Sequence, residues 1–267
     1  MSISIIIPIH EHNESIQEYI NKAIESVTKQ EGVETPTLIL VSPPNVENEL
    51  IKNQYSGITP TYLTNEGETD YQSQVNLAVD KVTTDYFTVL EFDDMLSPTY
   101  LKNGLSYIKN YPEIDIFLTM MIEVNEKNEG IKLTNETVWA QQFVGENGEM
   151  GYLNQNALKQ YTDFKLSGGI IKKSEFKNLG GYKVNIKLTF MYEFLLRALN
   201  NASKIFSIPK IGLKHLATRE GSLFDGYLKN MSIDERKFWF ETATKEANFM
   251  NDRPIDLSKL QKIVVAE

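Results

Sequence analysis

The chain contains no cysteine among its 267 residues, which excludes disulfide bonds, zinc–thiolate sites and thiol nucleophiles. It also has no excess of positive charge: 27 lysine and arginine residues stand against 36 acidic ones, a net charge of −9. Nucleic-acid binding through bulk electrostatics is therefore not expected. No apolar run reaches the roughly 18–20 residues that a membrane span needs. Because the opening MSISIIIPIH has no basic segment ahead of its apolar run, it is interpreted as a core strand and not as a signal peptide. We expect a soluble, cytoplasmic protein.

Short apolar runs of strand length are present in the first 90 residues, at 3–9, 37–41, 62–63 and 86–90. Between them, apolar residues recur at the spacing of amphipathic helices, as in Ile16, Ile20 and Ala23. Strands that alternate with helices across short connections specify a parallel sheet with helices on its faces. The sequence therefore predicts an α/β fold.

The later part of the chain is less regular. We expect helices over 97–110 and 190–200, strands over 114–124 and 168–172, and a final helix from the capping box of Ser232 and Glu235 to about residue 250. Residues 125–165 are polar and receive no assignment.

Three carboxylates follow the strand at 86–90, in the segment Glu91-Phe92-Asp93-Asp94. Ligands of open α/β sheets bind at the carboxyl ends of the strands, so these acids are placed where a ligand is expected. Side chains alternate along extended backbone, which would direct Glu91 and Asp93 to the same side. Two such oxygen donors suit Mg²⁺ or Mn²⁺ that bridges a diphosphate. The alternative is an acidic turn in which Asp94 or Ser97 caps the next helix.

Several segments, in this order, resemble the family-2 glycosyltransferases of the GT-A fold. They are PIHE (8–11), SVTKQ (26–30), YFTVLEFDDMLSP (86–98), FKNLGGY (176–182) and EFLLR (193–197). The resemblance covers residues 3 to about 220. It implies a GT-A, Rossmann-like α/β fold with a mostly parallel sheet and a helical C-terminal elaboration. The implied domain is 1–225, with a nucleotide-sugar half at 1–97 and an acceptor half at 98–225, followed by a helical extension over 226–267.

The resemblance also assigns site residues. It implies a Mn²⁺ or Mg²⁺ site made of Glu91, Asp93 and His215. Residues expected to bind the nucleotide or sugar are Pro8, His10, Glu11, Ser42, Asn76, Phe92, Gly169, Lys214 and Arg219. For some of these a simpler interpretation stays open: Gly169 could only make a bend, and Lys214 and Arg219 could belong to a solvated basic loop.

Two departures from the family pattern bear on catalysis. Ser42 stands where the family usually has an aspartate that contacts the base, and Phe190 and Met191 replace an acidic pair that supplies the general base in inverting members. Glu193 is the nearest remaining candidate base. Its alternative role is a surface ion pair with Arg197, four residues later on the same helix. Trp139 is a candidate for acceptor stacking or for ordinary packing.

The resemblance thus predicts a metal-dependent, inverting glycosyltransferase that uses a nucleotide-diphosphate sugar. The acceptor would be a glycan, a protein or a modified nucleobase, and self-association into a homo-oligomer is left open. The alternative is a catalytically degenerate GT-A-fold protein that serves as a binding or structural module. Loss of the acidic pair favours this alternative, whereas retention of Glu91, Asp93 and His215 favours the enzyme.

Overall fold

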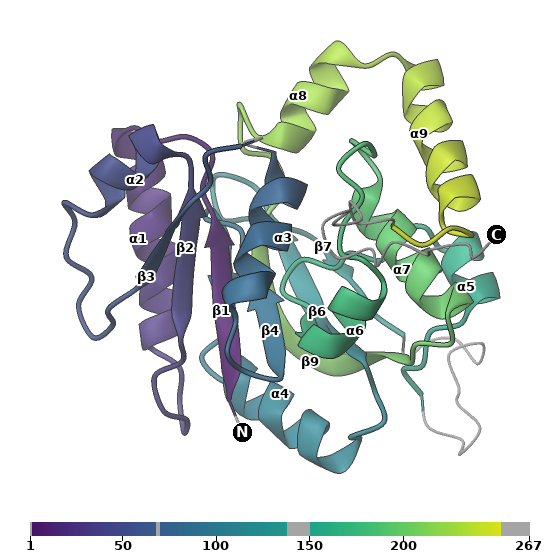
Figure 1. The fold of residues 1–267 in the computed structure, drawn as a ribbon, viewed down its shortest axis with the longest axis horizontal. Helices are drawn as coiled ribbons and strands as arrows, with labels where there is room; N and C mark the ends of the chain where they lie inside the picture. Colours follow the sequence, from purple (N-terminus) through teal and green to yellow (C-terminus); the bar gives the residue numbers. More distant parts are fainter. Residues whose placement is uncertain (1, 68–69, 138–149, 252–267) are drawn as a thin grey trace, which may run out of the picture.

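The computed structural model describes residues 2–67, 70–137 and 150–251, and shows a mixed α/β fold in which helices flank a central sheet (Figure 1). Trp139 lies outside the described residues. The first half comprises β1 (Ile3–Pro8), α1 (Glu14–Thr28), β2 (Leu38–Ser42), α2 (Pro44–Leu50), β3 (Thr61–Thr64), α3 (Tyr71–Lys81) and β4 (Tyr86–Val89). This is the alternation that the sequence predicts.

The second half adds strands to the same sheet. Its elements are β5 (Met95–Leu96), α4 (Tyr100–Asn110), β6 (Ile116–Val124), β7 (Gly130–Thr134), α5 (Gln155–Gln160), β8 (Ile170–Lys172), α6 (Lys173–Asn178), α7 (Phe190–Asn200), β9 (Ile205–Leu216), α8 (Leu223–Asn230) and α9 (Ile233–Glu246). Helix α7 has the predicted bounds. The elements β7, α5 and β9 are not predicted from the sequence, because β7 is exposed for most of its length and β9 mixes buried and exposed positions.

The strand order is β3-β2-β1-β4-β8-β6-β9-β5, with β7 beside β6. Strands β1 to β4 run parallel to one another, β8 is antiparallel to both β4 and β6, and β6 and β9 run parallel. One sheet therefore continues from the first half of the chain into the second, and it brings the ends of β4 and β9 near each other.

Apolar side chains fill both faces of the sheet. One core cluster joins the sheet to α3, α6 and α7, and the other joins it to α1 and α4. Along β1, Ile6 belongs to the first cluster and Ile5 and Ile7 to the second, as alternation along a buried strand requires. The helices on both faces hold the strand ends, and with them the site, in fixed positions.

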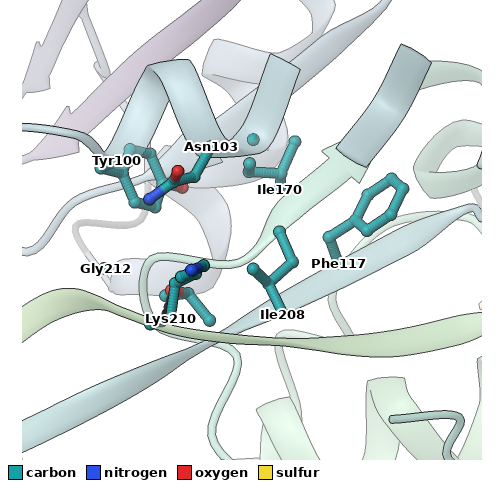
Figure 2. A pocket seen from close by; sticks show the side chains of 9 residues that line it. Tyr100, Asn103, Phe117, Ile170, Ile208, Lys210 and Gly212 are labelled. Carbon is teal, nitrogen blue, oxygen red and sulfur yellow. Dashed lines mark hydrogen bonds between the residues drawn. The ribbon is translucent and has the colours of Figure 1, made fainter. Parts of the chain in front are cut away.

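A small cavity lies between α4 and the sheet, where Tyr100, Asn103, Phe117, Ile170 and Ile208 are part of its wall (Figure 2). Its volume is about 10 Å³, close to the smallest space that holds one water molecule. None of the site residues predicted from the sequence lines it. It is a packing void and offers no room for a sugar or a nucleotide.

The C-terminal helices form an arch beyond the carboxyl ends of β1 and β4 (Figure 1). Helix α9 begins with the predicted capping box of Ser232 and Glu235 but ends at Glu246, before the predicted residue 250. Helix α8 has no buried residue. Across the described ranges, no helix is both long and apolar enough to cross a lipid bilayer.

Candidate metal and nucleotide site

The chain turns sharply just after β4, at the acidic segment. The backbone N–H of Asp94 donates to the carbonyl of Glu91 at 3.0 Å, which closes a turn across residues 91–94. The extended conformation predicted for this segment is therefore wrong. A turn of this kind brings its first and fourth residues together, so Asp94, and not Asp93, accompanies Glu91.

Glu91, Asp94 and His215 form a group whose potential ligand atoms all lie within 4.8 Å of one another. His215 comes from β9. Its Nδ1 lies 2.9 and 3.0 Å from the two carboxylate oxygens of Asp94, and the backbone N–H of Leu216 donates to Asp94 at 3.0 Å. The structure brings the predicted residues Glu91 and His215 together, and Asp94 joins them at the place for which the sequence predicts Asp93. Asp94 also does not cap α4, whose N-cap residue is Thr99.

Asp93 instead pairs with Arg219, whose Nε lies 2.6 Å from Oδ2 of Asp93. The same guanidinium lies 5.0 Å from the centre of the Phe92 ring and 3.7 Å from Glu11 Oε1. The ring of His10 is 5.6 Å from that of Phe92. The end of β1, the turn after β4 and the loop after β9 therefore bring five of the predicted residues into one cluster beside the carboxylates.

Burial sets the ionisation of the three carboxyl groups. Burial, and then repulsion from Asp94, raises the pKa of Glu91, and burial likewise raises the pKa of Asp94. Burial and repulsion from Glu91 raise the pKa of Asp93. Burial alone would lower the pKa of His215, but attraction to Asp94 outweighs it and raises that pKa to about 9. The folded protein thus concentrates negative charge where water cannot solvate it, and a cation bound there would relieve the repulsion.

The donor set of this group fits a divalent cation. Carboxylate oxygens suit both Mg²⁺ and Mn²⁺, and the imidazole nitrogen favours Mn²⁺. Nδ1 of His215 and the carboxylate of Asp94 face each other, so a cation held by both side chains would displace the proton that they share.

Without metal, the pair of His215 and Asp94 should make the protein less stable as pH rises above neutral. The pKa of His215 is raised from 6.5 to about 9, so the folded protein retains a proton that the unfolded chain releases. This contribution is complete below about pH 6.5 and disappears as pH rises through about 9. Thermal unfolding in EDTA should therefore show the wild type losing its advantage over His215→Gln across this range. A constant difference between the two proteins would contradict the ion pair.

Two further residues near this group have no signal in the sequence. Ser167 Oγ donates to Glu91 Oε1 at 2.6 Å and fixes that carboxylate. Lys165 pairs with Glu123 at 2.8 Å. It also lies close enough to Glu91 for its positive charge to oppose the burial that raises the pKa of Glu91. The backbone of Lys165 is held by the side chain of Asn135 through bonds of 2.8 and 2.9 Å. Only the fold brings this loop to the turn after β4.

Other predicted binding residues are engaged by the protein itself. The Asn76 side chain bonds the backbone N–H and carbonyl of Tyr182 at 2.8 and 2.9 Å. Lys214 donates to Asn128 at 3.0 Å and, as a strand neighbour of His215, points to the opposite face. Gly169 donates to the Leu166 carbonyl at 2.8 Å and is buried, which corresponds to the bend interpretation. The structure engages these three residues in contacts outside the carboxylate group.

Pro8 and Ser42 lie at the carboxyl ends of the paired strands β1 and β2 and are buried. They form part of the floor at this edge of the sheet. Since Ser42 carries no charge, a base contact at this position would be a neutral hydrogen bond, without the carboxylate that the resemblance leads one to expect.

Glu193 is the predicted residue whose surroundings differ most from expectation. Its side chain is fully buried, and both of its oxygens accept hydrogen bonds from Arg197, at 2.8 and 2.9 Å. Lys183 Nζ lies 3.2 Å from one of them. The predicted pair with Arg197 exists, but it lies in the core and not on the surface. A carboxylate shared between two buried cations is not placed to take a proton from an acceptor.

The start of α7 does reach the site, but it carries no carboxylate there. Ser167 Oγ lies 3.9 Å from the Met191 sulfur and 2.6 Å from Glu91. Phe190 packs against Tyr71 and Tyr182 at ring distances of 5.4 and 5.3 Å. The structure thus places the two apolar replacements beside the carboxylate group and within the aromatic core.

Comparison with known proteins identifies the family of this sequence. The sequence model of glycosyl transferase family 2 matches residues 4–170. No curated protein sequence matches the chain. Among solved structures, S. aureus TarS superposes with a TM-score of 0.60 at 17% identity, over 95% of this chain and 41% of that chain.

Two further structures are similar. A shorter form of S. aureus TarS in complex with UDP-GlcNAc gives a TM-score of 0.61 at 15% identity, over 93% of this chain and 82% of that one. The mannosyltransferase PcManGT from Pyrobaculum calidifontis, in complex with GDP-Man and Mn²⁺, gives 0.59 at 10% identity, over 82% and 58% of the two chains. At these identities the likeness establishes a shared fold. The chain belongs to glycosyl transferase family 2 and has the GT-A fold.

Proposed function

We propose that the protein is a metal-dependent, inverting glycosyltransferase that moves a sugar from a nucleotide-diphosphate donor to an acceptor hydroxyl. The observation that carries this proposal is the convergence of Glu91, Asp94 and His215 at the carboxyl ends of β4 and β9. Two structural neighbours were solved with UDP-GlcNAc and with GDP-Man and Mn²⁺, which supports a nucleotide-sugar donor and this class of cation.

The residues around the carboxylates would have different roles in binding the donor. Glu91, Asp94 and His215 would hold Mn²⁺ or Mg²⁺, which when bound neutralises the charge that develops on a departing diphosphate. Arg219 supplies a further positive charge at the same edge and, with Phe92 and His10, forms one wall of the site. Burial lowers the pKa of His10, so its ring is neutral at pH 7 and suited to packing against a nucleotide base.

Helix α7 would form part of the surface that faces the acceptor. Residues from α7 reach the site as Met191 and not as a carboxylate, so the acceptor hydroxyl would meet an apolar side chain at this point and would release its proton to water or to the departing diphosphate. Glycans, proteins and modified nucleobases all offer hydroxyl acceptors and remain within the proposal. Nucleotide binding without any turnover would favour the alternative of a degenerate binding module.

A thermal-shift titration tests the donor site. Nucleotide diphosphates with different bases are added to the full chain with Mn²⁺ or with EDTA. A nucleotide at 100 times its Kd adds about 2.7 kcal/mol of stability, a shift of about 5 °C or more. We expect one base to give a shift that requires Mn²⁺ and that is lost in Asp94→Asn.

Asp93→Asn is the matched control, because Asp93 is the neighbouring aspartate and pairs with Arg219. It should keep the Mn²⁺-dependent part of the shift. Loss of that part in Asp93→Asn with retention in Asp94→Asn would restore the assignment made from the sequence. Absence of any shift with every nucleotide would overturn the proposed function.

A further inference from the structure

Helix α9 carries an arginine, Arg236, whose buried Nε has no hydrogen-bond partner. The other arginines in the part of the chain that the structure describes, Arg197 and Arg219, both pair with carboxylates. Burying part of a guanidinium without an acceptor is costly, and an acceptor supplied from outside the chain would remove this cost.

The nearby carboxylates do not serve this arginine. Glu235 Oε2 accepts from the Ser232 backbone at 2.7 Å as part of the capping box. Glu241 lies 3.9 Å from Lys245, one turn further along α9. Glu235 and Glu241 thus make their polar contacts with other groups.

Arg236 lines a shallow, open hollow of about 630 Å³ along one face of α9. The other lining residues are Ile233, Lys237, Phe240 and Glu241. Ile233 and Phe240 are exposed. The hollow thus combines two cations with apolar side chains that can lie against a ring, and Glu241 is the single acid in its lining.

The hollow is connected to the proposed site through α7. Thr189 Oγ1 donates to the Trp239 carbonyl at 2.7 Å, and the rings of Tyr192 and Phe240 are 5.9 Å apart. Between these two contacts on α7 lies Met191, next to Ser167 and the carboxylate group. In Figure 1, α9 stands beside α7 and the arch extends beyond the strand ends. Residues of the hollow and residues around the carboxylate group thus contact the same end of α7.

We propose that this hollow binds an anionic group, a carboxylate or a phosphate, carried by the sugar acceptor. This inference rests on the proposed transferase function. Arg236 makes the principal contact, since a guanidinium presents a planar set of donors that matches both anions. Lys237 adds a second positive charge, and Ile233 and Phe240 pack against the ring that bears the anion. The substrate class is thus an acidic saccharide.

Binding of simple anionic sugars to the full chain tests the proposal. Glucuronate, glucose 6-phosphate, glucose and inorganic phosphate are titrated by NMR into the wild type, Arg236→Gln and Arg236→Lys. We expect the two acidic sugars to bind and glucose not to bind. Arg236→Gln should weaken their binding by about tenfold or more, as the loss of a charge-assisted hydrogen bond does, and Arg236→Lys should recover part of it.

Lys229→Gln is the matched control, because it removes one positive charge from α8, where Lys229 pairs with Asp225 at 2.9 Å. It should bind the acidic sugars as the wild type does. Equal binding by Arg236→Gln and the wild type, or equal binding of glucose, would overturn the anion site. Phosphate binding as tight as that of glucose 6-phosphate would overturn the role given to the ring.

The nucleotide thermal shift is measured on the same samples. If Arg236→Gln retains that shift, a failure to bind acidic sugars refutes only the acceptor class, and the donor site stands. If no nucleotide shifts any of the proteins, the proposed function itself fails.

Discussion

Exchange of Glu91 for glutamine should reduce donor turnover by a factor on the order of 10²–10³, the usual cost of removing one group that stabilises transition-state charge. Glutamine keeps the size of the side chain, and its carbonyl can still accept from Ser167 Oγ, which now lies 2.6 Å from Glu91. The change therefore removes the charge and leaves the packing. Turnover is measured as release of the nucleotide diphosphate from the donor that gives the Mn²⁺-dependent thermal shift.

Asp163→Asn provides the comparison. Asp163 pairs with Lys132 at 2.7 Å, its side chain is 65% exposed, and it lies outside the carboxylate group. Its turnover should equal that of the wild type. If Glu91→Gln kept full, Mn²⁺-stimulated turnover, the cation would have to be held by other residues and the proposed metal group would be refuted.

The sequence predicts the place of the acidic segment at the end of a strand more reliably than it predicts which aspartate lies beside Glu91. The buried strand that ends in acids at 91–94 locates the site, because the position of ligands at strand ends follows from the topology of the sheet. The choice between Asp93 and Asp94 depends on a turn closed by one backbone hydrogen bond. Extended and turned backbone are both compatible with these four residues, so the alternation argument selects Asp93, whereas the turn places Asp94 beside Glu91.

Contacts between distant segments are the part that sequence patterns do not contain. Ser167 meets Glu91 only because β8 lies beside β4 in the sheet. In the sequence, Arg236 is one of several charged residues on a helix. The structure shows that its Nε has no partner. Its significance depends on the bonds that Glu235 makes elsewhere. Packing between elements, and not local pattern, decides each of these cases.

Burial of Glu193 is a third such case, and it leads to the largest expected change in stability. The spacing of Glu193 and Arg197 predicts an ion pair, but both side chains have no exposed surface. Arg197 also donates to the carbonyls of Leu179 and Gly181, and Asn76 holds the next residue, Tyr182. The network thus fixes the turn that joins α6 to the segment before α7.

Glu193→Gln should therefore lower the free energy of unfolding by about 3–5 kcal/mol, since it leaves Arg197 and Lys183 buried without their shared carboxylate. At about 2–4 °C per kcal/mol, the melting temperature should fall by roughly 10 °C. Urea unfolding followed by circular dichroism measures the first quantity, and a thermal scan the second.

Glu25→Gln is the matched control for this prediction, because Glu25 and Lys29 also form a pair four residues apart, 2.5 Å between charged atoms, on the exposed surface of α1. Its cost should stay below about 1 kcal/mol. The comparison separates two roles for Glu193. A structural carboxylate predicts a large loss of stability together with donor turnover that persists in the fraction that remains folded. A catalytic base predicts the reverse, normal stability with turnover abolished, and that result would refute the structural role and restore Glu193 to the reaction.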